Sequence, residues 1–245
     1  MAEPKGACLV IGAGEDTGAA IARRFAKEGF EVCVARRPRH FEVLETLAAD
    51  IRNAGGMAHA FGVDAREEDD VVRLFETIER DIAALEIVVF NVGANVRFPI
   101  VETTARVYRK VWEMAAFAGV LAGREAAKYM SPRKRGTILF TGATASVRGS
   151  AGFSAFAGAK HALRALAQSM ARELGPLNIH VAHIVIDGAI DTKFIREALP
   201  NADELRADDG LVAPDAIAEA YVYLHNQPRT AWTHELDLRP WREKW

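Results

Sequence analysis

The sequence predicts an α/β fold, a doubly wound parallel sheet of about seven strands with helices on both faces, in a single domain spanning 1–245. Short apolar runs alternate along the chain with longer segments whose apolar residues recur at the helical period. Several short runs are apolar throughout, which is typical of parallel strands covered on both faces. Half of the 245 residues are hydrophobic, which is enough for one large core.

Strands are expected at seven short apolar runs, which are Ala7–Ile11, Val32–Ala35, Met57–Phe61, Ile87–Phe90, Thr137–Phe140, Ile179–Ile186 and Glu235–Leu238. Helical periodicity fills the segments between them, and its longest stripe runs from Phe156 to Leu174. The irregular segment 191–214 is rich in charge and turn residues. We expect it to be a substrate-specificity loop at the carboxyl edge of the sheet, where ligands bind in such folds.

Composition argues against several classes of partner. The net charge is −2, and the short basic cluster 133–135 is expected to be a solvated loop, so no nucleic-acid footprint is indicated. No apolar run approaches the ~18 residues that a membrane span needs, and no signal peptide is expected. Cys8 and Cys33 fall inside strand candidates and are expected to be buried thiols of a cytoplasmic protein. No metal-ligand cluster is evident.

A glycine-rich loop follows the first expected strand and opens the first helix. Gly12 permits a tight turn, Gly14 leaves room for a close ligand, and Gly18 lets the helix pack on the strand. Free N–H groups and the helix dipole at this point favour a pyrophosphate, although a purely structural turn is the alternative. Glu15 and Asp16 would repel a pyrophosphate. We therefore expect Asp16 or Thr17 to cap the first helix and to point away from the ligand.

Two arginines, Arg36 and Arg37, end the second expected strand. A carboxylate here would suit the ribose hydroxyls of NAD, whereas guanidinium groups suit the 2′-phosphate of NADP. The alternative is that both are surface arginines on a loop. We predict that the chain binds NADP(H) in preference to NAD(H).

Further motifs extend this pattern in order along the chain. Asp64 follows the third strand, Asn91-Val92-Gly93-Ala94 follows the fourth, and Gly188-Ala189-Ile190-Asp191-Thr192 follows the sixth. From about Lys5 to Leu238 the chain resembles short-chain dehydrogenases/reductases, although Asp187 replaces a proline of that family. The resemblance implies a Rossmann-type domain whose cofactor contacts are Gly12, Gly14, Thr17, Gly18, Arg36, Arg37, Asp64, Asn91, Gly93, Lys160, Gly188, Ile190 and Thr192.

The resemblance also implies an altered catalytic centre. The family's lysine is present as Lys160, but its tyrosine, serine and helix asparagine fall on Phe156, Ala143 and Ala116. Phe156 has no proton to transfer, and general acid–base help is typically worth 10²–10⁴ in rate. Lys160 is still expected to hold the ribose of the cofactor, unless it is a solvated helix lysine.

Two hypotheses of function follow from these observations. The first is that the protein is an enzyme that transfers a hydride between NADP(H) and a small molecule. An activated C=C bond fits, because the enolate needs only an electrostatic partner such as Lys160. Carbonyl reduction using Thr144 or Asn95 as substitute donor is a variant. The second hypothesis is an inactive nucleotide binder that acts as a sensor or subunit partner.

We also expect the chain to form a homodimer or homotetramer. Helix contacts between subunits are indicated by the small residues at 152–162 and by the Gly119-x-x-x-Gly123 spacing.

Overall fold

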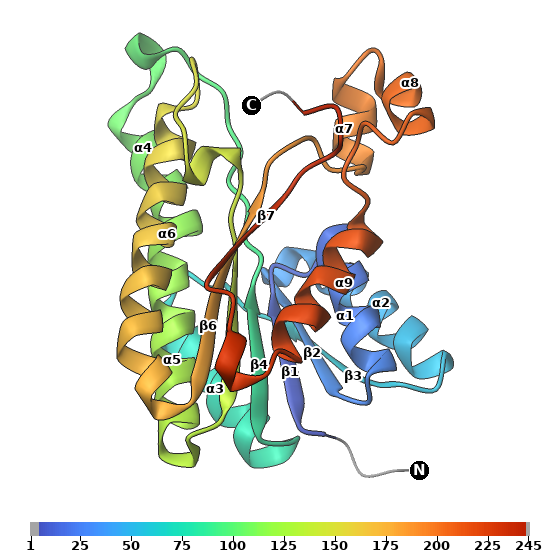
Figure 1. The fold of residues 1–245 in the computed structure, drawn as a ribbon, viewed down its shortest axis with the longest axis vertical. Helices are drawn as coiled ribbons and strands as arrows, with labels where there is room; N and C mark the ends of the chain where they lie inside the picture. Colours follow the sequence, from blue (N-terminus) through green and yellow to red (C-terminus); the bar gives the residue numbers. More distant parts are fainter. Residues whose placement is uncertain (1–4, 244–245) are drawn as a thin grey trace.

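The computed structural model describes residues 5–243, and within them the predicted fold class is confirmed (Figure 1). One parallel sheet has the order β3-β2-β1-β4-β5-β6-β7. Its strands are β1 Ala7–Ile11, β2 Glu31–Arg36, β3 Met57–Gly62, β4 Leu85–Phe90, β5 Gly136–Thr141, β6 Ile179–Ile186 and β7 Glu235–Leu238. The strand order reverses between β1 and β4, and this switch point is where a crevice opens at the carboxyl ends of the strands.

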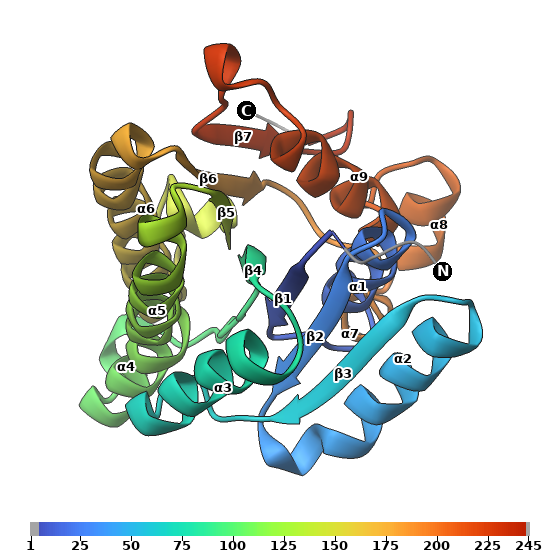
Figure 2. The ribbon, with the colours of Figure 1, turned by 90° about the horizontal axis from the view of Figure 1, so that it is seen from below.

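Helices cover both faces of the sheet (Figure 2). On one face lie α1, α2 and α9, and on the other lie α3, α5 and α6. The bounds of the helices are α1 Thr17–Lys27, α2 Phe41–Asn53, α3 Glu68–Asp81, α4 Ala105–Trp112, α5 Ala118–Arg133, α6 Ser154–Leu174, α7 Lys193–Ala198, α8 Ala202–Ala207 and α9 Pro214–His225. None of these helices is both long and apolar enough to cross a membrane.

Period-two alternation divides each strand between the two cores. In β6, Ala182 and Ile184 face the core under α1, α2 and α9, while Ile179 and Val181 face the core under α3, α5 and α6. Every residue of β6 is buried, as expected for a parallel strand covered on both sides. His183 is two residues after Val181 and points to the same face of the sheet, so it lies under α6.

The segment 191–214 is not one irregular loop, as the sequence pattern suggested. It forms the two short helices α7 and α8 at the carboxyl edge of the sheet, at the upper right of Figure 1. The side-chain hydroxyl of Thr192 accepts a hydrogen bond from Ile195 N at 3.2 Å and so begins α7. This cap supports a helix of only six residues, which is too short for its apolar period to be recognised in the sequence.

The Gly119-x-x-x-Gly123 spacing belongs to packing within one chain. A Cβ on Gly119 would lie 2.5 Å from Leu163 Cδ1, and one on Gly123 would lie 2.8 Å from Met170 Sδ. Leu163 and Met170 are both on α6. The interpretation of these two glycines as subunit contacts is therefore wrong, because they bring α5 against α6.

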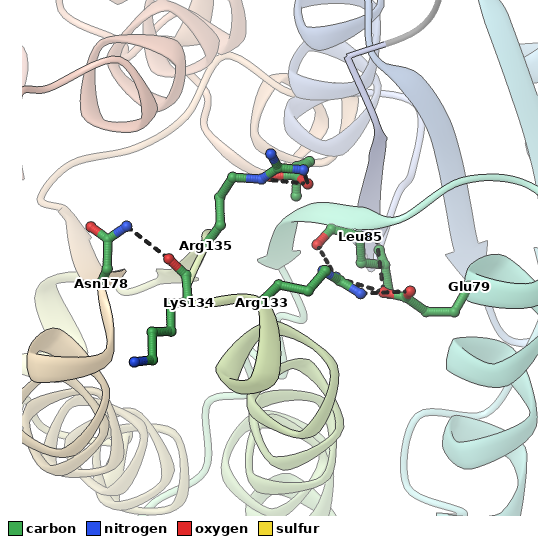
Figure 3. Close-up of polar contacts among 7 residues, drawn as sticks. Glu79, Leu85, Arg133, Lys134, Arg135 and Asn178 are labelled. Carbon is green, nitrogen blue, oxygen red and sulfur yellow. Dashed lines mark hydrogen bonds and ion pairs between the residues drawn. The ribbon is translucent and has the colours of Figure 1, made fainter.

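The basic cluster at the end of α5 is solvated only in part, because Lys134 and Arg135 are exposed while Arg133 is half-buried (Figure 3). Arg133 makes two hydrogen bonds to Glu79 at 2.8 and 2.9 Å and a third to Leu85 O at 2.9 Å. Arg135 pairs with Glu86, whose side chain is only 8% exposed. These arginines join the end of α5 to α3 and to the start of β4, although the side chain of Arg135 remains 66% exposed.

Candidate functional site

A crevice runs along the carboxyl ends of the strands at the switch point. Two cavities form it. The first, here called the β4 cavity, is lined by the ends of β1–β4 and includes Arg36, Arg37 and Asp64. The second, the α7 cavity, lies between the glycine loop Gly12–Gly18 and α7. Because residues such as Arg36 and Asn91 line both, the two cavities are parts of one elongated site.

The glycine loop forms a cradle at the centre of this crevice. Gly12 has a φ of +87°, and a Cβ there would lie 2.7 Å from Asn91 O. A Cβ on Gly18 would lie 2.7 Å from the backbone of the same loop. At Gly14 the space is open, and an added Cβ would come no closer than 3.5 Å to Arg36. The first and last glycines are thus needed for packing, while the middle one leaves the loop open to a ligand.

The two acids of the loop lie beside this cradle. Asp16 is at the N-cap position of α1, but its side chain accepts no hydrogen bond from the helix, so the predicted side-chain cap is wrong. Thr17 is buried as the first residue of α1. Asp16 lines the α7 cavity, and its charge adds to the larger effect of Asp191 in raising the pKa of Arg196 on α7. The acidic loop therefore lies across the α7 cavity from Lys193 and Glu197 of α7.

Positive charge gathers in the β4 cavity. Within residues 5–243, neither Arg36 nor Arg37 comes within ion-pair distance of a carboxylate. Burial and then the neighbouring cations lower the pKa of Arg37. Arg66, which the sequence reading missed, donates to both carboxylate oxygens of Asp64, at 2.9 and 2.5 Å. Its only sequence signal is its position two residues after Asp64. The cavity thus presents guanidinium groups beside an acid that is already paired.

The other cofactor-binding candidates divide into residues that line the crevice and residues that shape it. Asn91 does both, since its Nδ2 donates to Gly12 O at 3.2 Å and braces the glycine loop. Gly93 lines the β4 cavity, and Thr192 lines the α7 cavity. Gly188, with a φ of +152°, and Ile190, which bridges to Val212, line neither cavity. They form the backbone turn that leads into α7.

The three positions that the family resemblance identifies as altered lie together in space. Ala116, Ala143 and Phe156 belong to one hydrophobic cluster with residues of α4 and α6. Phe156 is 8% exposed. Ala116 lies in a π-helical turn, Glu113–Phe117, a feature that is frequent at functional sites. These three positions therefore form part of one packed apolar cluster.

Lys160 is buried beside this apolar surface. Its side chain is 2% exposed, and Nζ donates to Thr141 O at 2.8 Å and to Val92 O at 3.1 Å. The ammonium also lies 5.9 Å from the centroid of the Phe156 ring. Burial lowers the pKa of Lys160 to about 8. The alternative of a solvated helix lysine is therefore wrong.

The two substitute donors have different surroundings. Thr144 begins a short turn after β5, and its hydroxyl donates to Asp187 Oδ1 at 2.6 Å. Asp187 is a buried carboxylate at the end of β6, and the sequence reading noted it only as a replacement for proline. Asn95 is exposed, and neither Asn95 nor Thr144 lines the β4 cavity or the α7 cavity. Among the described side chains, no three of His, Cys, Asp or Glu are grouped to hold a metal ion.

Comparison with known proteins places this site in a family. The family described as short chain dehydrogenase matches residues 7–203. The chain belongs to the short-chain dehydrogenase family. It is thus an NAD(P)-dependent oxidoreductase by class. A short-chain dehydrogenase from Rhodopseudomonas palustris is 48% identical, with a TM-score of 0.83, over 97% of this chain and 100% of that one.

Two more distant short-chain dehydrogenases complete the comparison. The short-chain dehydrogenase/reductase eriH of Hericium erinaceus is 31% identical over 178 residues, covering 71% of each chain. A metagenomic short-chain oxidoreductase in complex with NADP is 24% identical, with a TM-score of 0.82, over 97% of this chain and 98% of that one. The last likeness establishes the shared fold alone.

Proposed function

We propose that this short-chain dehydrogenase reduces an activated C=C bond of a small molecule with NADPH, with an activated carbonyl as the variant substrate. One observation carries the proposal. Phe156, Ala143 and Ala116 form a single apolar surface, yet the buried ammonium of Lys160 is kept beside it. A substrate that needs little proton transfer while it reacts suits such a centre, whereas an ordinary ketone does not.

The crevice fits a dinucleotide with an additional phosphate. The open cradle at Gly14 suits a pyrophosphate, because an added Cβ there would meet no atom closer than 3.5 Å and because Thr17, where α1 begins, lines the same cavity. Arg36 and Arg37 supply positive charge to the β4 cavity. They would hold the 2′-phosphate of NADP(H), and Asp64 with Asn91 would border the adenosine half. When bound, the cofactor supplies the hydride.

Lys160 can both stabilise the negative charge that develops on the substrate and supply the proton that the product needs. An ammonium has three N–H donors, and Thr141 O and Val92 O accept two of them. We infer that the third serves the ribose hydroxyls or the substrate oxygen on which negative charge develops. After the hydride adds to carbon, a proton must reach the product. A group whose burial lowers its pKa to about 8 is suited to give that proton and regain it from water near neutral pH.

Cofactor binding is the first test. Titration of NADPH fluorescence should show that Arg36→Ala weakens NADPH about tenfold or more, since a charge-assisted contact is worth about 1.5–3 kcal/mol. NADH binding should change little. Arg39→Ala is the matched control, because Arg39 is exposed and lines neither cavity. Equal effects of Arg36→Ala on the two cofactors would contradict the preference for NADP(H).

Turnover is the second test. Absorbance of the reduced nicotinamide is followed with a panel of enones, aldehydes and ketones. We expect consumption of NADPH with enones and little with simple ketones. The Phe156→Tyr variant should gain ketone reduction, because it restores a phenol four residues before Lys160. If NADPH binds and no compound consumes it, the alternative of an inactive nucleotide binder takes the place of this proposal.

We also propose that the chain is a cytoplasmic homo-oligomer. Large apolar side chains are exposed on α4 and the segment before it, and Val101 is 90% exposed, so this surface suits a subunit contact. Sedimentation velocity would show a single monomer species if the homo-oligomer proposal is incorrect.

The proposed cytoplasmic location rests on the cysteines. Both cysteines are free and buried, as suits a reducing compartment. Imaging of a tagged chain tests the compartment.

A further inference from the structure

We propose that Thr144 and Asp187 orient the substrate, and that this pair selects an apolar compound bearing a hydroxyl or N–H group. The inference rests on the proposed function, because it concerns the substrate of the same centre. It goes beyond it by naming the chemical group that the substrate must present.

The pair lies at the edge of the altered centre. Thr144 directly follows Ala143, one of the three apolar positions, and Asp187 is the last residue before Gly188 in the turn toward α7. The side chain of Asp187 is buried, while Thr144 is only partly buried. Asp187 N donates to Leu238 O at 2.7 Å, so the backbone of Asp187 is fixed by the sheet. The threonine that binds this acid is partly exposed.

The direction of the hydrogen bond determines what Thr144 can offer. A threonine hydroxyl has one proton and two lone pairs, and a carboxylate has no proton to give. Since Thr144 Oγ1 lies 2.6 Å from Asp187 Oδ1, its proton is used in that bond. Its lone pairs remain for another partner. Thr144 therefore accepts a hydrogen bond from the substrate, whereas a serine free to rotate can donate one to a carbonyl oxygen.

Two guanidinium groups stabilise this arrangement. Arg239 Nη2 lies 3.3 Å from Asp187 Oδ2, and Arg148 Nη2 lies 3.7 Å from Oδ1. A buried carboxylate without such partners would be costly, and with them it stays an acceptor. Arg148 is also 3.6 Å from Glu243, so its charge is shared between two acids. The arginines thus favour the direction of this hydrogen bond in which Thr144 donates and the Asp187 carboxylate accepts.

On the side of Thr144, away from the two arginines, the pair borders apolar residues. Ala143 and Ala145, on either side of Thr144, pack with the cluster that contains Phe156 and Phe153. One acceptor in an apolar wall recognises a compound that is hydrophobic except for one donor, such as a phenol, an enol or a hydroxylated enone. A carbonyl compound without a donor would leave the lone pairs of Thr144 unpaired.

Four small probes of similar size test this on the protein saturated with NADPH. Phenol carries a donor, anisole lacks it, benzaldehyde carries only an acceptor, and benzoate carries a charge. Their affinities are measured by saturation-transfer NMR. We expect the wild-type protein to bind phenol about tenfold more tightly than anisole, which is the effect of one hydrogen bond in an apolar site.

Variants of the pair sharpen the test. In Asp187→Asn the amide can donate to Thr144, which frees the hydroxyl proton, so the preference should move from phenol toward benzaldehyde. Thr144→Val should remove the preference for phenol over anisole, and Thr144→Ser should keep it. The two Thr144 variants alone decide the question if Asp187→Asn does not fold, as judged by circular dichroism.

The outcomes separate this inference from the proposed function. Equal binding of phenol and anisole by the wild-type protein, or an unchanged preference in Thr144→Val, would overturn the inference while leaving cofactor binding intact. Tightest binding of benzoate would overturn it in favour of recognition by Arg148. A failure to bind NADPH would instead refute the proposed function, and the phenol preference of the free protein would then be measured separately.

Discussion

Lys160 illustrates how one buried charge is accommodated without its usual partner. Two backbone carbonyls, Thr141 O and Val92 O, hold the ammonium at the ends of β5 and β4. The ring of Phe156 offers only a weak cation–π contact. Within the described part of the chain Lys160 has no carboxylate at ion-pair distance, and burial lowers the pKa of Lys160 to about 8. The residue thus lowers stability where it is charged, which is expected of a group kept for function.

This cost predicts a dependence of stability on pH. In the unfolded chain the pKa of Lys160 returns to 10.5, so between pH 8 and 10.5 the unfolded state binds more protons than the folded state. The free energy of unfolding should therefore rise with pH in this window, by up to about 3 kcal/mol from this residue. Urea unfolding at pH 7.5 and 10 should show that the wild type gains stability relative to Lys160→Met. A constant difference between the two proteins would contradict the assignment.

Asp187 and Arg66 show where residue-level reasoning from sequence stops. Lys160 was predictable because a family motif surrounds it, and the glycine loop because strand, turn and helix follow one another. Nothing in the sequence, however, indicates that Asp187 meets Thr144, which is 43 positions away, or that both oxygens of Asp64 are taken by Arg66. Such pairs depend on which strand ends are neighbours and on side-chain rotamers, which local patterns do not contain.

The end of α5 is held both by a backbone cap and by charged side chains. Lys134, the C-cap residue, has a φ of +52°, in the left-handed region. Arg133 reaches Glu79 on α3 and Leu85 O on β4, and its side chain is only 29% exposed. The contact fixes three elements at the edge of the sheet opposite to the crevice. Its bidentate geometry and partial burial make it stronger than a surface ion pair.

Substitutions in this cluster should therefore differ sharply. Arg133→Ala should lower the free energy of unfolding by about 2–3 kcal/mol, because Glu79 loses its partner at a partly buried position. Lys134→Gly should be neutral or stabilising by up to about 1 kcal/mol, since glycine adopts a positive φ without strain. Urea denaturation of both variants measures the contrast. Equal losses would show that the cluster is solvated, as the sequence pattern first suggested.

Element positions were more predictable than element contacts. All seven strands were predicted, and β1, β6 and β7 agree in both bounds. Most of them are continuous apolar runs, as expected for buried parallel strands, whereas β7 is not buried. The helices α7 and α8 were missed because six residues are too few to show a period. The Gly119–Gly123 spacing indicated close helix contact correctly, but a spacing alone does not say whether the partner helix is in the same chain.

Across the whole molecule, two histidines with lowered pKa values, one on each face of the sheet, make the stability of the fold depend on acid pH. His225 on α9 accompanies Phe25 and Phe30 on one face of the sheet, while His183 on β6 lies under α6 on the other. Burial lowers the pKa of each from 6.5 to about 4. Glu235 offsets this at His183 only in part. Neither imidazole is therefore charged in the folded protein at neutral pH.

Protonation of His183 and His225 should lower the free energy of unfolding at acid pH. Between pH 6.5 and 4 the unfolded chain binds more protons than the folded one, so the free energy of unfolding falls as the pH falls, by up to about 3 kcal/mol for each histidine. His183→Gln and His225→Gln should each flatten this fall, and their effects should add because the sheet separates the sites. His59→Gln, at a side chain that is 41% exposed, is the control. Urea unfolding from pH 7 to 4.5 measures the slopes, and a double variant as acid-sensitive as the wild type would show that other groups control the transition.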